Sequence, residues 1–206
     1  MKRFSIALAL LAAAPPLLAQ GGARPAWTIR PDGATAADTS VVAVTMPPGW
    51  HLTTKTLGAI LFDPAWTATG SYRVVTSGFV FPGSDLEGYG VFFGGHDLDG
   101  PNPSYLCLLL RKDGRYQIEH RQAEQVHVIV PWTSNPAINH PEPKPAQNEI
   151  AIDVSGDSLA FAVNGKRLAA WPRGRLDDGG GGQVGLRLGR GMSVHVTKVE
   201  VTPAAR

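Results

Sequence analysis

The sequence contains little cysteine and little charge, and each shortage excludes a class of protein. Cys107 is the single cysteine among 206 residues, so no disulfide can form within the chain. Its neighbours in Tyr105-Leu-Cys-Leu-Leu-Leu110 are apolar, which predicts a buried thiol without chemistry. Charged residues make up 17% of the chain and hydrophobic residues 43%, whereas a disordered chain is rich in charge and poor in hydrophobic residues. The sequence therefore predicts a folded domain that needs no disulfide.

Long helices are a second absence. Together the 24 glycines and 17 prolines occupy one position in five, and both residue types destabilise the interior of a helix. Between them lie short runs rich in Val, Ile, Leu and aromatic residues, about ten residues apart, which is typical of antiparallel strands separated by turns. The expected strands are residues 41–46, 58–62, 71–81, 88–93, 105–111, 115–120, 125–130, 149–154, 159–163, 185–188 and 193–201.

Turn residues and side-chain alternation support these strands. Asp113-Gly114 and Asn164-Gly165 are dipeptides that accept the positive φ angles of tight hairpin turns. Ile150, Ile152 and Val154 occupy alternate positions, as in a strand with one buried face. Because no crossover helices are expected, the strands form either a barrel or two packed antiparallel layers. The favoured fold class is all-β, a two-layer antiparallel jelly-roll sandwich.

Three segments between or within these strands need separate interpretation. Residues 119–130 lack Gly and Pro and could form a helix, but the β-branched stretch 126–130 favours a strand. Residues 131–145 contain five prolines, which predicts a stiff surface loop. Residues 177–182 are mostly glycine and predict a flexible connector, and a bulge is expected near Lys198.

The first nineteen residues have the layout of a secretory signal peptide. Lys2 and Arg3 precede an apolar run over residues 4–18, and the small residue Ala19 follows as the expected cleavage point. Prolines interrupt the run, which is also short for a membrane span. The expected organisation is a signal peptide at 1–19, an N-terminal extension at 20–39 and a single β-sandwich domain at 40–206. The expected location is secreted or periplasmic, with no membrane span after cleavage.

Without the signal peptide, positive and negative side chains are equal in number. Lys2 and Arg3 are the only charged residues removed, so 17 cations face 17 acids. The arginines are scattered among strand-like segments and do not form the basic stripe that a phosphate backbone requires. Nucleic acid is therefore not an expected partner.

Several stretches, taken in order, carry a family resemblance. They are residues 87–100, residues 105–120 around Asp113-Gly114, residues 148–150, Phe161-Ala-Val-Asn-Gly165 and Gly185-Leu-Arg-Leu188. This pattern resembles the concanavalin A-like, laminin-G-like jelly-roll superfamily. In particular it resembles bacterial exported domains of unknown function labelled 3-keto-disaccharide hydrolase. The resemblance covers about residues 40–202, and it implies a carbohydrate as the ligand class.

Candidate ligand-binding residues surround the proline-rich loop and one glycine-rich turn. An exposed indole at Trp132 could stack on a sugar ring, while amide and imidazole groups reach its hydroxyls. The alternative is that Trp132 anchors the loop to the core. The full set of candidate ligand-binding residues is Trp132, Asn135, Asn139, His140 and His96.

The turn after His96 also offers oxygen ligands to a cation. Asp97, Asp99 and Asn102 supply carboxylate and amide oxygens within a few residues, which suits Ca²⁺ better than a softer metal. The alternative is an ordinary polar turn. The six histidines show no short-spaced pair with a matching third ligand, so zinc is not expected.

Catalytic carboxylates are harder to identify from this sequence. Glycoside hydrolases need two carboxyl groups across a sugar, and the Glu-x-Asp-x-x-Glu spacing of the family-sixteen enzymes of this superfamily is absent. The leading hypothesis is non-catalytic binding of a saccharide or cell-surface glycan through connecting loops. One alternative is a glycoside or 3-keto-glycoside hydrolase or lyase that uses Asp97, Asp99 or His140. A second alternative is a structural envelope or protein-interaction module.

Overall fold

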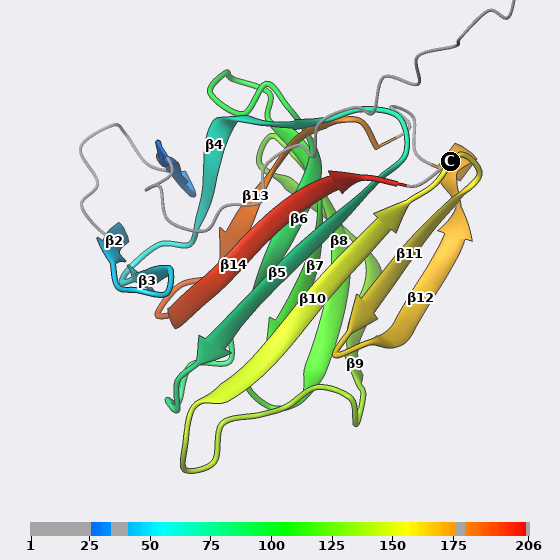
Figure 1. The fold of residues 1–206 in the computed structure, drawn as a ribbon. Helices are drawn as coiled ribbons and strands as arrows, with labels where there is room; N and C mark the ends of the chain where they lie inside the picture. Colours follow the sequence, from blue (N-terminus) through cyan, green and yellow to red (C-terminus); the bar gives the residue numbers. More distant parts are fainter. Residues whose placement is uncertain (1–25, 34–40, 176–179, 205–206) are drawn as a thin grey trace, which may run out of the picture.

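Two stacked antiparallel sheets account for most of the chain (Figure 1), as the alternation of apolar residues predicts. The computed structural model describes residues 26–33, 41–175 and 180–204. Within them, each sheet has seven strands. Sheet I has the order β1 (Thr28–Pro31), β4 (Ala59–Ala68), β13 (Gly182–Leu188), β6 (Tyr89–His96), β7 (Ser104–Arg111), β8 (Arg115–Gln122) and β9 (Gln125–Ser134). Sheet II has the order β12 (Lys166–Pro172), β11 (Ser158–Val163), β10 (Ala146–Val154), β5 (Tyr72–Val80), β14 (Ser193–Pro203), β3 (Trp50–Thr54) and β2 (Val41–Thr45).

The main core lies between the two sheets. Alternate residues of each strand enter it, for example Leu106, Leu108 and Leu110 of β7, all of which are buried. The intervening residues of β7 point to the outer face of sheet I. The predicted two-layer jelly-roll sandwich is confirmed, and residues 119–130 form strands β8 and β9 instead of a helix.

Some strands differ from the sequence-based expectation in number and length. Strands β1, β3 and β12 were not among the expected strands, and β1 lies within residues 20–39, the range expected to be an extension. Strand β9 continues to Ser134, so the proline-rich loop starts later than residue 131. Pro131 is tolerated because β9 is the edge strand of sheet I, where a missing N–H breaks no ladder bond.

The predicted hairpin turns are present. Asn164 and Gly165 join β11 to β12 and have φ angles of 48° and 74°. Asparagine and glycine adopt such positive φ angles more readily than other residues. Gly114 has a φ of 76° in the turn between β7 and β8. The predicted bulge in β14 lies between Val196 and Lys198.

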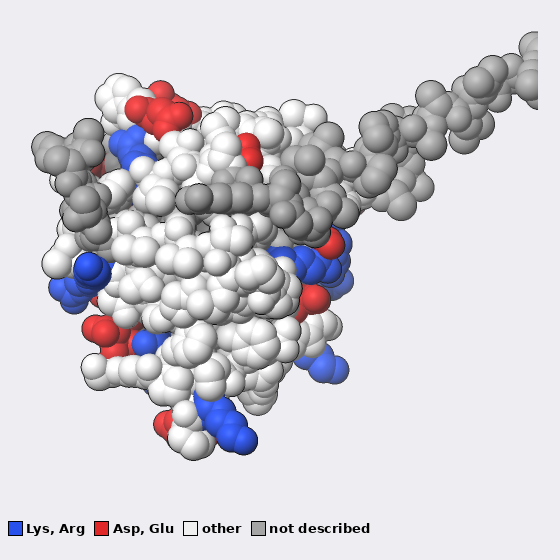
Figure 2. Space-filling model, turned by 60° about the vertical axis from the view of Figure 1, so that its left-hand side comes forward, with Lys and Arg blue, Asp and Glu red and all other residues white. Residues whose placement is uncertain are grey.

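The two ends of the chain are only partly described. The predicted signal peptide at 1–19 lies outside the described residues, as do residues 177–179 of the expected connector. No helix among the described residues is long and apolar enough to cross a membrane. The face in Figure 2 carries lysine, arginine and acidic side chains in small separate groups around a broad uncharged area.

Candidate functional site

The outer face of sheet I has its own apolar layer. Its members are buried although they point away from the main core; they are Ile60, Phe62, Phe92, Leu98, Tyr105, Cys107 and Leu109. Gly185 makes room for this layer, because a Cβ there would lie 2.5 Å from the Phe92 ring. Leu98 reaches the layer from the connection between β6 and β7. The result is a preformed apolar floor on a face that no third layer of the described residues covers.

Cys107 belongs to this floor, and the prediction of a buried thiol is confirmed. Its side chain is fully buried and free of any disulfide. Burial and the nearby Glu119 raise the pKa of the thiol, so it stays protonated and unreactive. Cys107 therefore contributes packing beneath the site.

A network of two acids and two arginines lies over the floor. Arg187 donates to both carboxylate oxygens of Asp32, at 2.8 and 2.5 Å. Arg121 donates to Glu119 at 2.6 Å, and its guanidinium lies 4.0 Å from Asp32. Arg187 and Glu119 are each only 3% exposed. Burial at this level requires paired charges, which the network supplies.

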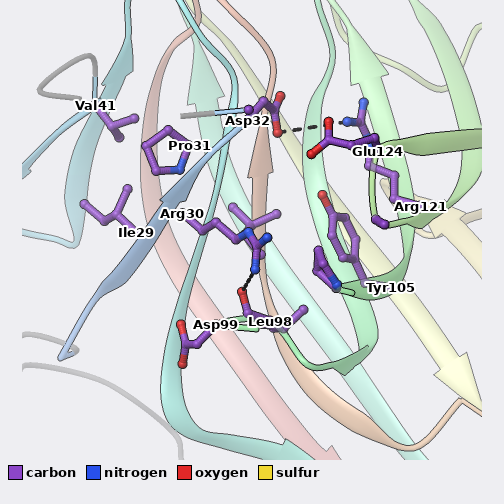
Figure 3. Close-up of a pocket in the computed structure, with 14 residues that line it drawn as sticks. Ile29, Arg30, Pro31, Asp32, Val41, Leu98, Asp99, Tyr105, Arg121 and Glu124 are labelled. Atoms are coloured by element: carbon purple, nitrogen blue, oxygen red, sulfur yellow. Dashed lines mark hydrogen bonds and ion pairs between the residues drawn. The ribbon is translucent and has the colours of Figure 1, made fainter. Parts of the chain in front are cut away.

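Two adjacent hollows flank Arg121, and together we call them the groove. The large hollow has a volume of about 740 Å³ and is lined by Arg30, Asp32, Asp99, Tyr105, Arg121 and Glu124, among others. Figure 3 shows Arg30 of β1 on one side of this hollow and Tyr105 of β7 and Arg121 of β8 on the other. The small hollow has a volume of about 250 Å³ and is lined by Glu87, Gln117, Glu119, Arg121, Trp132 and Arg187, among others.

Each hollow contains a nearly buried polar group that is free for a ligand. Tyr105 in the large hollow is 6% exposed, and Gln117 in the small hollow is 9% exposed. Among the described residues, none hydrogen-bonds the Tyr105 hydroxyl or the Gln117 amide. Burial raises the pKa of Tyr105, so its hydroxyl stays neutral and can both donate and accept. Groups of this kind are expected to bind either water or a ligand.

Trp132 lies in the groove, but in strand β9 and not in a loop. It packs against the apolar floor and lines the small hollow. The Arg111 guanidinium lies 4.9 Å from its ring centroid, covering one face of the indole. A Cβ at Gly88 would lie 2.9 Å from the ring tip. The indole is thus held in place by its neighbours and presents its remaining surface to the hollow.

The other predicted ligand-binding residues lie outside the lining of either hollow. The Asn135 side chain accepts from the Ala137 N–H, and the Asn139 side chain donates to the Gln147 carbonyl, so both hold the loop after β9. His140 lies beside Gly114 in the turn between β7 and β8. His96 ends β6 and is exposed. None of these four residues lines the groove with Trp132.

The predicted calcium ligands form a tight turn. Asp97 has a φ of 51°, and its carboxylate accepts from the Asn102 N–H at 2.7 Å. Asp99 lines the large hollow instead. Among the described residues, no three histidine, cysteine or acidic side chains cluster around a possible metal position. The hydrogen bond to Asn102 explains Asp97 without a metal, so the residues do not fit a calcium site well.

Sequence reasoning missed most residues of the groove. Gln117, Glu119 and Arg121 alternate along β8 and therefore share its outer face. Large polar residues at alternate positions of a strand next to the apolar β7 were the signal that could have revealed them. Asp32 and Arg187 are 155 positions apart in sequence, and no local pattern indicates that they meet.

Comparisons with known proteins establish the fold. No protein-family model matches the sequence, and no curated protein sequence matches it. The structure is similar to the carbohydrate-binding module CBM66 from Bacillus subtilis, with a TM-score of 0.63, 11% identity, and coverage of 86% of this chain and 96% of the module. It is similar to a mixed-linkage glucan GH16 protein from Bacteroides ovatus, with a TM-score of 0.56, 8% identity and coverage of 85% and 94%.

A third similar structure is the alginate lyase A1-II′ of polysaccharide lyase family 7. The TM-score is 0.51, the identity is 11%, and the match covers 87% of this chain and 80% of the lyase. At these identities the likeness shows the fold alone. The chain thus has a concanavalin A-like jelly-roll fold, which its neighbours use for binding, hydrolysis or lyase chemistry.

Proposed function

We propose that the protein binds a saccharide in the groove on the outer face of sheet I and does not catalyse a reaction of that saccharide. The observation that carries the proposal is the pair of nearly buried polar groups Tyr105 and Gln117, which have no hydrogen-bond partner among the described residues and lie at the apolar floor. A sugar ring has apolar C–H faces and hydroxyls that both donate and accept. A ligand site with an apolar wall and a few placed polar groups matches that chemistry. A binding module and a glucan hydrolase that share the fold are consistent with this ligand class.

Binding without turnover is favoured by the state of the two carboxylates. Hydrolysis of a glycoside needs one carboxylic acid that donates a proton and a second carboxylate across the sugar. Both oxygens of Asp32 accept from Arg187, and Glu119 accepts from Arg121. Each of the two carboxylates is thus already paired with an arginine.

The residues named for an enzymatic alternative do not form one centre. Asp99 belongs to the connection before β7, whereas His140 lies beside Gly114, directly after β7. The eight residues of β7 separate them by about 25 Å along the strand. A glycoside or 3-keto-glycoside hydrolase would have to draw its two carboxyl groups from the acids that line the groove, which are Asp32, Glu87, Asp99, Glu119 and Glu124.

The enzymatic alternative is tested by product release. Purified protein is incubated with disaccharides and 3-keto-disaccharides, with and without Ca²⁺, and the products are separated by chromatography. We expect no product in either condition. Product formation that Glu119→Gln abolishes would replace the binding proposal with an enzymatic one. A structural or protein-interaction module, the remaining alternative, predicts neither product nor saccharide affinity.

Binding is tested by calorimetric titration after a glycan-array screen of the secreted or periplasmic form that we propose, residues 20–206. Gln117→Leu removes the free amide of the small hollow, and we expect it to weaken binding about fivefold, because a lost hydrogen bond is worth roughly 1 kcal/mol. Gln122→Leu is the matched control, since Gln122 is exposed and lies on the opposite face of β8. Absence of saccharide binding by the unaltered protein would contradict the proposal, as would an equal loss of affinity in the two variants.

A further inference from the structure

Acidic side chains outnumber arginines in the lining of the groove. In the large hollow, Arg30 and Arg121 face three acids, Asp32, Asp99 and Glu124. In the small hollow, Arg121 and Arg187 face Glu87 and Glu119. Recognition of a carboxylate or sulfate requires arginine or lysine groups without an acid partner of their own. An anionic sugar entering the large hollow would instead meet an excess of acidic side chains.

The arginines of the groove already have partners in the protein, and Arg30 donates to the Leu98 and Gly100 carbonyls. Arg121 and Arg187 already donate to Glu119 and Asp32, whereas the Tyr105 hydroxyl and the Gln117 amide have no partner among the described residues. A hydroxyl and an amide both donate and accept, and a sugar hydroxyl does the same. The available hydrogen bonds therefore fit a ligand that is rich in hydroxyl groups and carries no charge.

Tyr105 and Gln117 lie at well-separated backbone positions along the strands. In the register of β7 and β8, Tyr105 is opposite Arg121 and Leu109 is opposite Gln117. Four residues separate Arg121 from Gln117 along β8, a distance of about 13 Å. That is longer than a single pyranose or furanose ring spans. Arg121, beside Tyr105, lines both hollows, and Glu119 lies between Arg121 and Gln117 on the same face of β8.

We propose that the groove selects uncharged oligosaccharides that occupy both hollows, with one subsite at Tyr105 and Arg121 and a second at Gln117. The inference rests on the proposed saccharide-binding function and adds the charge class and the minimum length of the ligand. The bound chain would follow β7 and β8, since the two subsites are spaced along these strands.

The charge class and the length are tested by calorimetry with defined probes. Neutral series of one to six rings, made of gluco-, xylo-, manno- and fructo-oligosaccharides, are compared with galacturonate and alginate oligomers of the same lengths. We expect at least a tenfold gain in affinity from one ring to four in the neutral series that binds. Uronate oligomers are expected to bind at least tenfold more weakly. The dissociation constant for the neutral ligand should not change between about 50 and 500 mM NaCl, since only charged ligands are screened.

Two conservative variants separate the subsites. Tyr105→Phe and Gln117→Leu are each expected to weaken the four-ring ligand about fivefold, while a one-ring ligand responds to only one of them. Tyr116→Phe and Gln122→Leu are the matched controls, because the Tyr116 hydroxyl contacts the Leu168 carbonyl on the core side and Gln122 lies on the other face of β8. Circular dichroism and urea unfolding verify the fold of each variant.

Failure of the proposed saccharide binding can be distinguished from failure of the proposed selectivity for charge and length. If no saccharide binds, the proposed function fails. If saccharides bind but uronates bind as tightly as neutral chains, or one ring binds as tightly as four, saccharide binding stands and the present inference is overturned. An equal effect of Tyr105→Phe and Gln117→Leu on a one-ring ligand would also overturn it.

Discussion

Arg187 carries a positive charge into a position where only 3% of the residue is exposed. Its hydrogen bonds to both oxygens of Asp32 compensate that charge and tie the residue after β1 to β13. Removing one partner of a buried ion pair costs more than the pair contributes, because the other charge remains buried alone. Asp32 therefore affects both stability and the shape of the groove.

Asp32→Ala is predicted to lower the free energy of unfolding by about 3 kcal/mol. The control is Asp153→Ala, since both oxygens of Asp153 accept from one guanidinium nitrogen of Arg73, yet both side chains are more than 40% exposed. An exposed pair contributes less than about 1 kcal/mol. Urea unfolding of the two variants measures the difference. Equal decreases in the free energy of unfolding of the two variants would show that the burial of Arg187 does not increase the cost of removing its partner.

At the scale of strands, the sequence predicts the features that depend on residues adjacent in the chain. The hairpin at Asn164-Gly165 and the bulge near Lys198 follow from neighbouring residues, and both are present. Strand β1 could not be predicted, because four residues after Trp27 become a strand only by pairing with β4. Trp132 was placed in a loop because Pro131 precedes it, and only the edge position of β9 makes that proline compatible with a strand.

The pairing of β3 with β14 brings two histidines together on sheet II. His51 and His195 are directly opposite each other, and the Nδ1 atoms of both are buried without a partner among the described residues. Burial and the neighbouring His195 lower the pKa of His51 from its usual value of 6.5. A lowered histidine pKa means that the unfolded chain binds this proton first as the pH falls.

The free energy of unfolding should therefore decrease as the pH falls below about 6.5, until the pH reaches the lowered pKa of His51. His51→Gln should reduce this decrease, because the substituted position takes up no proton in either state. Urea unfolding of the protein and the variant at several pH values between 7.5 and 5 measures the two slopes. Identical slopes would show that His51 does not contribute to the pH dependence.

At the scale of the molecule, sheet I has two functions on its two faces. Its inner face closes the main core, and its outer face supplies the floor and the charged groups of the groove. The groove joins residues of β1 near one end of the chain, β7 and β8 in the middle, and β13 near the other end. Fold class follows from repeated local patterns, whereas this assembly depends on contacts between distant segments, so a single sequence indicated the sandwich but not the site.

Strand β1 and the residues on either side of it are expected to belong to the folded unit. Strand β1 completes the edge of sheet I, Trp27 packs edge-to-face on Trp50 and Trp66, and Asp32 pairs with Arg187. A chain that begins at residue 34 loses all of these contacts, whereas one that begins at residue 20 keeps them. We expect the shorter chain to be at least about 3 kcal/mol less stable and to lose saccharide affinity, since Arg30 and Asp32 line the large hollow. Urea unfolding and calorimetry of both chains test this, and equal stability and affinity would place the boundary near residue 40 instead.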